Sequence, residues 1–318
     1  ASKAPVLGPY VIDDWTSAQK IKLRSNPHYD NHPRPPAEVL VIDDDETALG
    51  LYRAGTLSLL RRLPTHYLKS WKETKELHFI PVARFDYIGF GPPLNEDRFL
   101  SLRQAMAHSL KYEDLKRLYE ARGLPGCPGI DRRHFDTVPC HEFNVAKARA
   151  LLNLKEKQPP LLLAFSKLGG DDVQKGMEWA QAQWQKNLGL HVELRSVEQA
   201  VYLQMLKTSP PPLFRKGVGL DRDSCLAAVE IFLEKDPENF IQLKDAKYEG
   251  LVEKLKTSTS SAARQKACTA AVRYLIETAR IIPTGPIHFA ILVKPAFTGW
   301  SISPMNQLDL RHLSSAGR

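Results

Sequence analysis

The consecutive residues Cys140, His141 and Glu142 combine a nucleophile, a base and a carboxylate, the side chains that covalent hydrolysis uses. Adjacent residues, however, rarely place a nucleophile against its own base. The sequence also contains no GxSxG or HExxH motif, the patterns that mark many serine hydrolases and zinc proteases. We therefore expect no catalytic residue and a protein that is not an enzyme.

The ten histidines and four cysteines show no metal-ligand spacing, so we expect no metal site and no cofactor. Cys127 and Cys140 bracket a loop rich in proline and glycine, with 12 residues between them. A disulfide between them would stabilise the fold by about 3 kcal/mol in an oxidising compartment. Cys268 lies in an alanine-rich stretch that predicts a helix, and we expect it to be a buried small apolar side chain.

The composition is that of an ordinary globular protein. The chain has 318 residues, of which 43% are hydrophobic and 25% charged, and this length allows two domains. The formal net charge is +8, but the lysines and arginines are scattered and no nucleic-acid-binding motif is present, so we expect no nucleic acid partner. No apolar run is long enough for a membrane helix, and no signal peptide is visible at residues 1–5.

The hydrophobic pattern alternates between short strands and longer helices, which predicts an α/β fold. Residues 39–42 form an apolar run that predicts a buried strand, and the acidic residues 43–46 are typical of a helix start. The other expected strands lie at residues 10–14, 20–25, 77–81, 159–165, 191–194, 213–218 and 282–293. The other expected helices lie at residues 98–110, 112–121, 143–152, 171–188, 198–206, 225–234, 248–256 and 262–281.

Two stretches near the start resemble a family signature. Residues 8–15 read Gly-Pro-Tyr-Val-Ile-Asp-Asp-Trp, and residues 19–29 read Gln-Lys-Ile-Lys-Leu-Arg-Ser-Asn-Pro-His-Tyr. Together they resemble the GPY…W…Q.I.L.RNP.Y signature of the extracellular solute-binding proteins of family 5, which serve oligopeptide, dipeptide and nickel ABC importers. Residues 87–107, 143–152 and 184–192 resemble further motifs of that family in the same order.

The resemblance implies a periplasmic-binding-protein-like two-lobe fold of type II, in the peptide-binding cluster. Residues 83–299 would form the second lobe, and residues 1–82 and 300–318 would belong to the first. The opening strands of the first lobe and a small extra domain would lie before residue 1, leaving that lobe incomplete with an exposed sheet edge and apolar face. Either a second chain supplies that part, or the sequence is a fragment or a diverged short member.

The resemblance also implies a peptide ligand and a partner, the membrane permease of an ABC importer, with the protein in the periplasm or attached to the cell envelope as a lipoprotein. In the family, the aspartate of a G-W-x-a-D-y pattern binds the peptide ammonium, since a buried charge needs a counter-ion. This chain reads Gly-Val-Gly-Leu-Asp-Arg there, so Asp221 would bind the ammonium, with Val218, Gly219 and Leu220 beside it.

Two further residues match ligand-binding positions of the family. Arg215 matches a cleft arginine of some members. Trp300 falls where the family has an aromatic residue at its second hinge, and it could stack on the ligand or pack the hinge.

The chain departs from the family around Asp221. Val218 replaces the tryptophan of the pattern, and the tyrosine and proline that follow the aspartate are absent. The alternative is that Asp221 pairs with Arg222 at the surface while Asp223 caps the next helix, and the ancestral site is lost. The sequence thus indicates the substrate-binding protein of an ABC importer, or alternatively a diverged or truncated regulatory or interaction protein that keeps the fold without transport.

Overall fold

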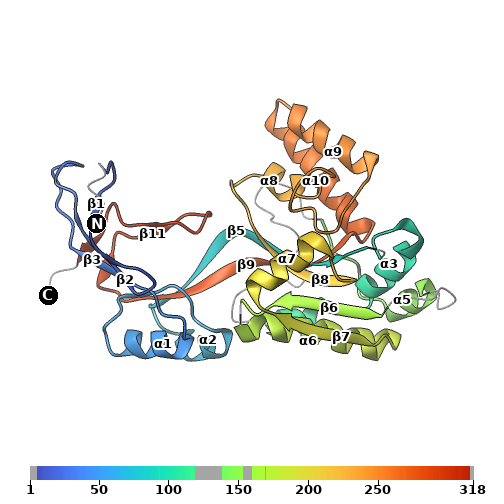
Figure 1. Ribbon diagram of the computed structural model, residues 1–318, viewed down its shortest axis with the longest axis horizontal. Coiled ribbons are helices and arrows are strands. Elements are labelled where there is room, and N and C mark those ends of the chain that lie inside the picture. Colours follow the sequence, from blue (N-terminus) through green and yellow to red (C-terminus); the bar gives the residue numbers. More distant parts are fainter. Residues whose placement is uncertain (1–5, 93, 119–137, 153–159, 169, 316–318) are drawn as a thin grey trace. The chain divides into compact units, whose positions relative to one another are not determined.

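The computed structural model describes residues 6–92, 94–118, 138–152, 160–168 and 170–315. The chain divides into two compact units: unit 1 comprises Ala1–Val82 and His288–Arg318, and unit 2 comprises Ala83–Ile287. Strands β5 (Leu77–Phe90) and β9 (Ile281–Val293) each continue from one unit into the other (Figure 1). No helix among the described residues is long and apolar enough to cross a membrane.

Unit 1 contains short strands and short helices. Its elements are β1 (Tyr10–Thr16), β2 (Lys20–Ser25), β3 (Ala37–Leu40), α1 (Asp45–Arg53), β4 (Leu59–Leu60), η1 (Thr65–Tyr67), α2 (Leu68–Trp71), β10 (Phe297–Thr298), β11 (Ser301–Ile302), β12 (Leu308–Asp309) and β13 (Ser314–Ser315). Helix α1 begins in the acidic run, as predicted, because the Asp44 carboxylate accepts a hydrogen bond from the backbone N–H of Thr47 at 2.7 Å.

One face of the antiparallel sheet β1–β2–β3 is apolar and largely uncovered. We call it the apolar sheet face; it is formed by two rows of cross-strand neighbours, which are Trp15, Ile21 and Val39, and then Ile12, Leu23 and Ala37. A register shift before Asp14 keeps both rows on the same side of the sheet. Trp15 is 63% exposed and Val39 is 43% exposed, so this face lacks a second layer within the part of the chain that is described.

The prediction of a buried strand at residues 39–42 was wrong. The strand β3 ends at Leu40, and both Val39 and Val41 are exposed. An apolar run is buried only where another layer of the protein covers it, and the sequence pattern of the run itself carries no information about that layer.

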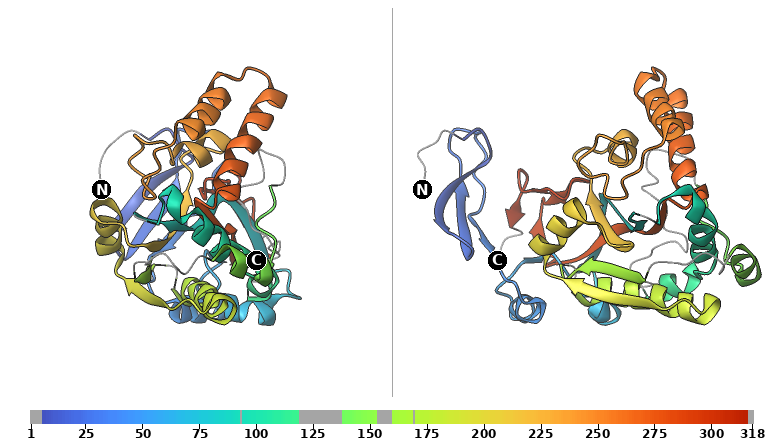
Figure 2. Two further views of the ribbon diagram at one scale, coloured as in Figure 1. Left: turned by 90° about the vertical axis from the view of Figure 1, so that its right-hand side faces the viewer. Right: turned by 45° about the vertical axis from the view of Figure 1, so that its right-hand side comes forward.

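Unit 2 is built on a mixed sheet in the order β9-β5-β8-β6-β7. Its other elements are η2 (Asp97–Phe99), α3 (Leu100–His108), α4 (Tyr112–Leu118), α5 (Val145–Leu151), β6 (Leu161–Ser166), α6 (Gly170–Leu188), β7 (Val192–Val197), α7 (Gln199–Thr208), β8 (Leu213–Gly219), α8 (Cys225–Glu230), α9 (Ala246–Thr257) and α10 (Ser261–Glu277). β6 pairs in parallel with β7 and β8, and α6 and α7 connect these strands. The α/β class expected from the sequence is confirmed. Helices α9 and α10 lie side by side (Figure 2).

The core of unit 2 lies between the sheet and helices α3 and α6. It includes Ile88 of β5, Leu213 of β8 and Trp184 of α6, all fully buried. The indole N–H of Trp184 donates a hydrogen bond to the Met106 carbonyl at 3.0 Å, which satisfies the one polar atom of that side chain. The opposite face of the sheet carries Tyr87, whose ring contacts three phenylalanine rings.

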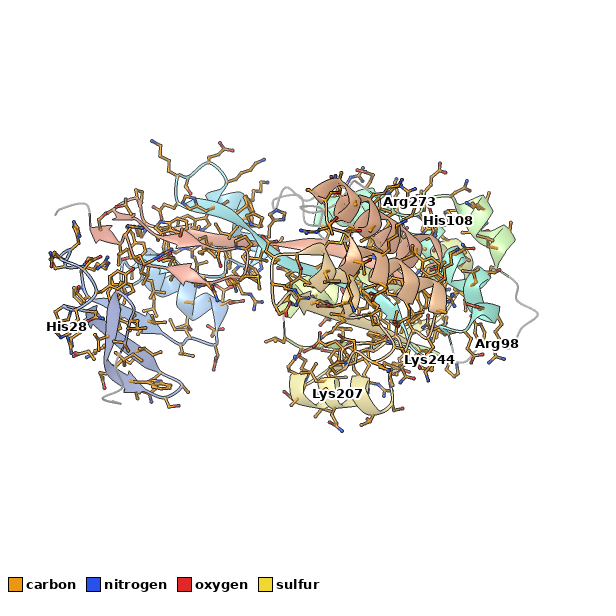
Figure 3. The ribbon with its side chains drawn as sticks, turned by 90° about the horizontal axis from the view of Figure 1, so that it is seen from above. His28, Arg98, His108, Lys207, Lys244 and Arg273 are labelled. Carbon is orange, nitrogen blue, oxygen red and sulfur yellow. A yellow bond between two sulfur atoms is a disulfide. The ribbon has the colours of Figure 1, made fainter. Side chains whose placement is uncertain are left out.

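His108, at the end of α3, ties that helix to the segment before α5 (Figure 3). It is buried, and its Nδ1 lies 2.7 Å from the carbonyl oxygen of Glu142, to which the N–H donates. Its ring meets the ring of His141 edge-on, with 4.7 Å between the ring centres.

A disulfide joins Cys225 of α8 to Cys268 of α10, with 6.2 Å between the Cα atoms. The prediction that Cys268 is only a buried apolar side chain was therefore wrong: it is buried and also bonded, because two helices distant in sequence pack together. Of the other expected pair, Cys127 lies outside the described residues, and Cys140 is itself disulfide-bonded.

Candidate ligand-binding site

Five of the six residues predicted to bind a ligand lie in β8 or directly after it, and the sixth, Trp300, belongs to unit 1. Arg215, Val218 and Gly219 belong to this strand, and Leu220 and Asp221 follow it directly. Val218 and Leu220 are buried, so their side chains pack inside the protein and do not face solvent. Gly219 and Asp221 are the exposed members of this group.

The register between β5 and β8 adds two charged residues that the sequence did not single out. Asp86 lies opposite Gly217, and Arg84 lies opposite Gly219. Because side chains alternate along a strand, Arg84, Asp86 and Arg215 all lie on one face of the sheet. Their only sequence signal is the spacing of two between Arg84 and Asp86, which becomes informative once the pairing with β8 is known.

Arg215, predicted to be a ligand-binding arginine, is already paired with a carboxylate of the neighbouring strand. Its Nη2 forms an ion pair with Asp86 Oδ2, and the two side chains are 8% and 9% exposed. Burial, and then the charge of Arg84, lower the pKa of Arg215 to about 9. The guanidinium therefore remains a cation at neutral pH, and Asp86 is the counter-ion that makes its burial tolerable.

Arg84 shares the same carboxylate without a hydrogen bond. Its Nε lies 3.6 Å from Asp86 Oδ1 and, like that oxygen, has no hydrogen-bond partner within the described residues. The guanidinium lies close over Gly217, where a Cβ would come within 2.4 Å of Arg84 Nη2 and 2.7 Å of Asp86 Oδ1. A residue larger than glycine would push into this charge cluster.

Asp221 is exposed and paired with its neighbour. Its Oδ2 accepts a hydrogen bond from Arg222 Nη1 at 2.7 Å, and Arg222 also contacts Glu230 of α8. The cap of α8 is Ser224 and not Asp223, because the Ser224 hydroxyl accepts from the backbone N–H of Ala227 at 3.2 Å. An exposed ion pair of this kind contributes little, so it leaves the carboxylate available to another cation.

Trp300 belongs to unit 1. Its ring makes an edge contact with His78, with 5.2 Å between the ring centres. Its role as a ligand contact stays a prediction.

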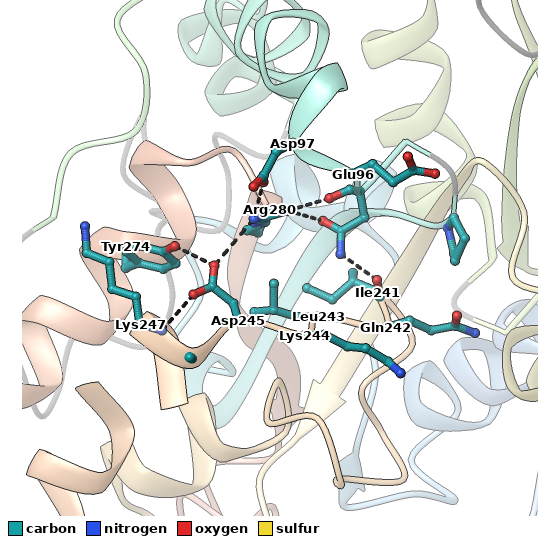
Figure 4. A pocket seen from close by; sticks show the side chains of 13 residues that line it. Glu96, Asp97, Ile241, Gln242, Leu243, Lys244, Asp245, Lys247, Tyr274 and Arg280 are labelled. Atoms are coloured by element: carbon teal, nitrogen blue, oxygen red, sulfur yellow. Dashed lines mark hydrogen bonds and ion pairs between the residues drawn. The ribbon is translucent and has the colours of Figure 1, made fainter. Parts of the chain in front are cut away.

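A pocket of about 680 Å³ also lies in unit 2, lined by η2 and by the loop before α9. Arg280 donates there to Asp97 Oδ1 at 2.7 Å and lies 3.4 Å from Asp245 Oδ2 (Figure 4). Asp245 also accepts from the Tyr274 hydroxyl at 2.5 Å and caps α9. These contacts join η2, the start of α9, α10 and the residue before β9, so we interpret the pocket as a structural junction. The residues that line it include none of those predicted from the sequence.

Metal binding has no structural support among the residues described. They contain no group of three or more histidine, cysteine, aspartate or glutamate side chains that could hold a metal ion.

Comparison with known proteins identifies the relatives of the chain. The profile described as bacterial extracellular solute-binding proteins, family 5 Middle, matches residues 1–239. The chain is 24% identical over 306 residues to the oligopeptide-binding protein OppA of Bacillus subtilis (strain 168), covering 89% of this chain and 55% of that protein. It is 26% identical over 313 residues to the "Probable deoxycholate-binding periplasmic protein YgiS" of Escherichia coli (strain K12), covering 93% and 58%.

A similar fold occurs in the solved structure of the Escherichia coli murein tripeptide binding protein MppA. The TM-score is 0.81 at 20% identity, over 98% of this chain and 64% of that chain. The likeness confirms the periplasmic-binding-protein-like fold of type II. The chain spans a little over half the length of the curated relatives it matches.

Proposed function

Because this chain belongs to the bacterial extracellular solute-binding proteins of family 5, we propose that it is the substrate-binding component of an ABC importer and that its ligand is a peptide. Two of the relatives above are named for a peptide ligand, which supports this choice. We place the protein in the periplasm or on the cell envelope, with the membrane permease of the importer as its partner. Unit 2 would be the second lobe of the family fold, and unit 1 would belong to the first.

The observation that carries the proposal is the exposed carboxylate of Asp221 at the end of β8. It lies two residues after the exposed Gly219, and the side chain of the intervening Leu220 is buried, so a ligand ammonium could approach it without displacing a large side chain. The competing ion pair with Arg222 is solvent-exposed and worth about 0 to 1 kcal/mol, which a ligand cation can replace.

The Asp221→Ala variant tests this role by calorimetry with tri-alanine and N-acetyl-tri-alanine. We expect the variant to bind the free-amine peptide at least tenfold more weakly, about 1.4 kcal/mol, and the acetylated peptide as the wild type does. Glu193→Ala is the matched control, since it removes another exposed carboxylate that pairs with a nearby arginine.

Equal affinity of the wild type and Asp221→Ala for the free-amine peptide would contradict the role of Asp221. Failure of the wild type to bind either peptide would favour the alternative function, a regulatory or interaction protein that keeps this fold without transport. The pairing of Asp221 with Arg222 is the observation that favours that alternative.

We also propose that a further polypeptide segment packs on the apolar sheet face, either from the same polypeptide or from a second chain. The 63% exposure of Trp15, and relatives nearly twice as long as the matched region, support this.

Native mass spectrometry of the protein from its own cells would detect a longer chain or a bound second chain. Trp15→Asp should abolish association of a second chain, whereas Lys22→Ala, in the row on the opposite face, should not. A bare 318-residue chain with solvent-exposed Trp15 fluorescence would contradict the proposal.

A further inference from the structure

The charge cluster on β5 and β8 holds two cations and one anion. Arg84 and Arg215 both lie within 4 Å of Asp86, and this carboxylate is the only anionic partner that either guanidinium has within the described residues. The cluster therefore carries one excess positive charge in a partly buried place. Such a charge favours the approach of an anion.

The two arginines differ in how closely they are bound to Asp86. Arg215 is buried and forms a direct ion pair with Asp86. Arg84 is 36% exposed in its side chain, lies beyond hydrogen-bond distance of Asp86, and makes no hydrogen bond with another described residue. The free binding capacity of the cluster thus belongs to Arg84, whose planar guanidinium is suited to an oxyanion.

The other cations near the end of β8 have partners of their own. Lys216 points to the opposite face of the sheet, where its Nζ lies 3.8 Å from Glu238 and over the ring of Phe240. Arg222 contacts both Asp221 and Glu230. Lys216 therefore does not compete with Arg84 for an incoming anion, and Arg222 keeps Glu230 as its partner when a ligand ammonium takes its place at Asp221.

The space beside Arg84 is open on one side. Its cross-strand neighbour is Gly219, and no heavy atom of the described chain lies within 4 Å of the position that a Cβ would take there. On the other side, the guanidinium of Arg84 packs against the backbone of Gly217 on β8, which the absence of a side chain there allows. A ligand group could therefore reach Arg84 across Gly219.

We propose that Asp86 is an internal carboxylate that keeps Arg215 out of ligand binding, and that Arg84 binds an oxyanion of the ligand beside Gly219. The oxyanion is a carboxylate or a phosphate. The inference rests on the proposed function in so far as the ligand is a peptide, whose free end or acidic side chain would supply the carboxylate. Arg84 is then a specificity-determining residue that family motifs did not indicate.

The first experiment compares tri-alanine with its C-terminal amide by calorimetry on the full chain. We expect Arg84→Gln to weaken binding of the free acid at least tenfold and to leave the amide unchanged. Arg98→Gln, which removes an exposed arginine paired with Glu96 elsewhere in unit 2 (Figure 3), should bind both as the wild type does. Arg215→Lys keeps a cation against Asp86 and should preserve the preference for the acid.

An equal loss for acid and amide in Arg84→Gln, or no loss, would overturn the proposal, as would a collapse of the acid preference in Arg215→Lys.

A second measurement separates this failure from failure of the peptide function. Acetate and inorganic phosphate are titrated while the Nε–Hε resonance of Arg84 is followed by NMR. A shift of that resonance in a protein that binds no peptide would support the anion site and exclude a peptide as its ligand. The anion that causes the shift at the lower concentration would show whether the natural ligand group is a carboxylate or a phosphate. Absence of a shift with both anions overturns the site.

Discussion

The carboxylate of Asp86 on β5 and the guanidinium of Arg215 on β8 form a buried ion pair between neighbouring strands. The pair lies where the apolar face of the unit 2 sheet ends and the charged end begins. Ile88, directly opposite Arg215, is fully buried in the core, so the ion pair borders a dry region. Its energetics therefore differ from those of the exposed pairs elsewhere on the surface.

Removing Asp86 should destabilise unit 2 strongly. In Asp86→Ala, Arg215 is left buried beside Arg84 without a counter-ion, and the expected loss in the free energy of unfolding is about 3 to 5 kcal/mol. Urea denaturation followed by circular dichroism measures it. The double variant Asp86→Leu/Arg215→Met should recover most of the loss, since it removes both charges. A loss below about 1 kcal/mol in the single variant would mean that the pair behaves as an exposed one.

Gly217 and Gly219 should respond differently to alanine. In Gly217→Ala the new Cβ would lie within 3 Å of Arg84 Nη2, the end of a flexible side chain, and of Asp86 Oδ1, which the ion pair with Arg215 holds in place, and we expect a loss of about 1 kcal/mol from overpacking. In Gly219→Ala the new methyl group meets open space, so we expect no loss, or a gain of up to about 1 kcal/mol from reduced entropy of the unfolded chain. Thermal unfolding of the two variants side by side checks this, and equal effects would contradict the crowding at Gly217.

The disulfide between Cys225 and Cys268 should stabilise unit 2 by limiting its unfolded chain. The two cysteines are 43 residues apart, and the chain-entropy model gives about 4 kcal/mol for a loop of that length. Urea denaturation of Cys225→Ala/Cys268→Ala should show a loss of this order. Chemical reduction of the wild type should shift its unfolding in the same direction. Thiol titration that finds both cysteines free in the unreduced, unfolded wild type would exclude the bond.

Acid should destabilise the protein partly through His141. Burial, and then the charges of His108 and Lys147, lower the pKa of His141 to about 4, below about 6.5 in an unfolded chain. The unfolded chain therefore binds the extra proton more readily, so the stabilising contribution is present above about pH 6.5 and is lost as the pH falls towards 4. The free energy of unfolding, measured with urea between about pH 7 and pH 4, should fall less steeply in His141→Gln. Identical slopes in the wild type and in His141→Gln would refute the assignment.

The sequence by itself determined the family, the α/β class and most of the local structure. The family follows from the resemblance of the motifs and their order. Local rules suffice for the class and the local structure, because periodicity reports which side of a strand or helix is apolar and a capping side chain acts within three residues. The Asp44 side chain caps α1 in this way. The family motifs follow one another in the expected order from residue 8 to β8, the strand that contains Arg215. The exposed aspartate at the end of β8 could likewise be predicted from its motif.

Only the tertiary structure decided how the charges are shared. The role of Arg215 depends on Asp86, and the two residues meet because β5 and β8 pair in one particular register. The same is true of Cys268, whose partner comes from a different helix, and of Val39, whose apolar side chain lies on an uncovered sheet face. In each case the deciding contact joins residues far apart in the sequence, and a pattern within one segment carries no information about which distant segment will pack against it.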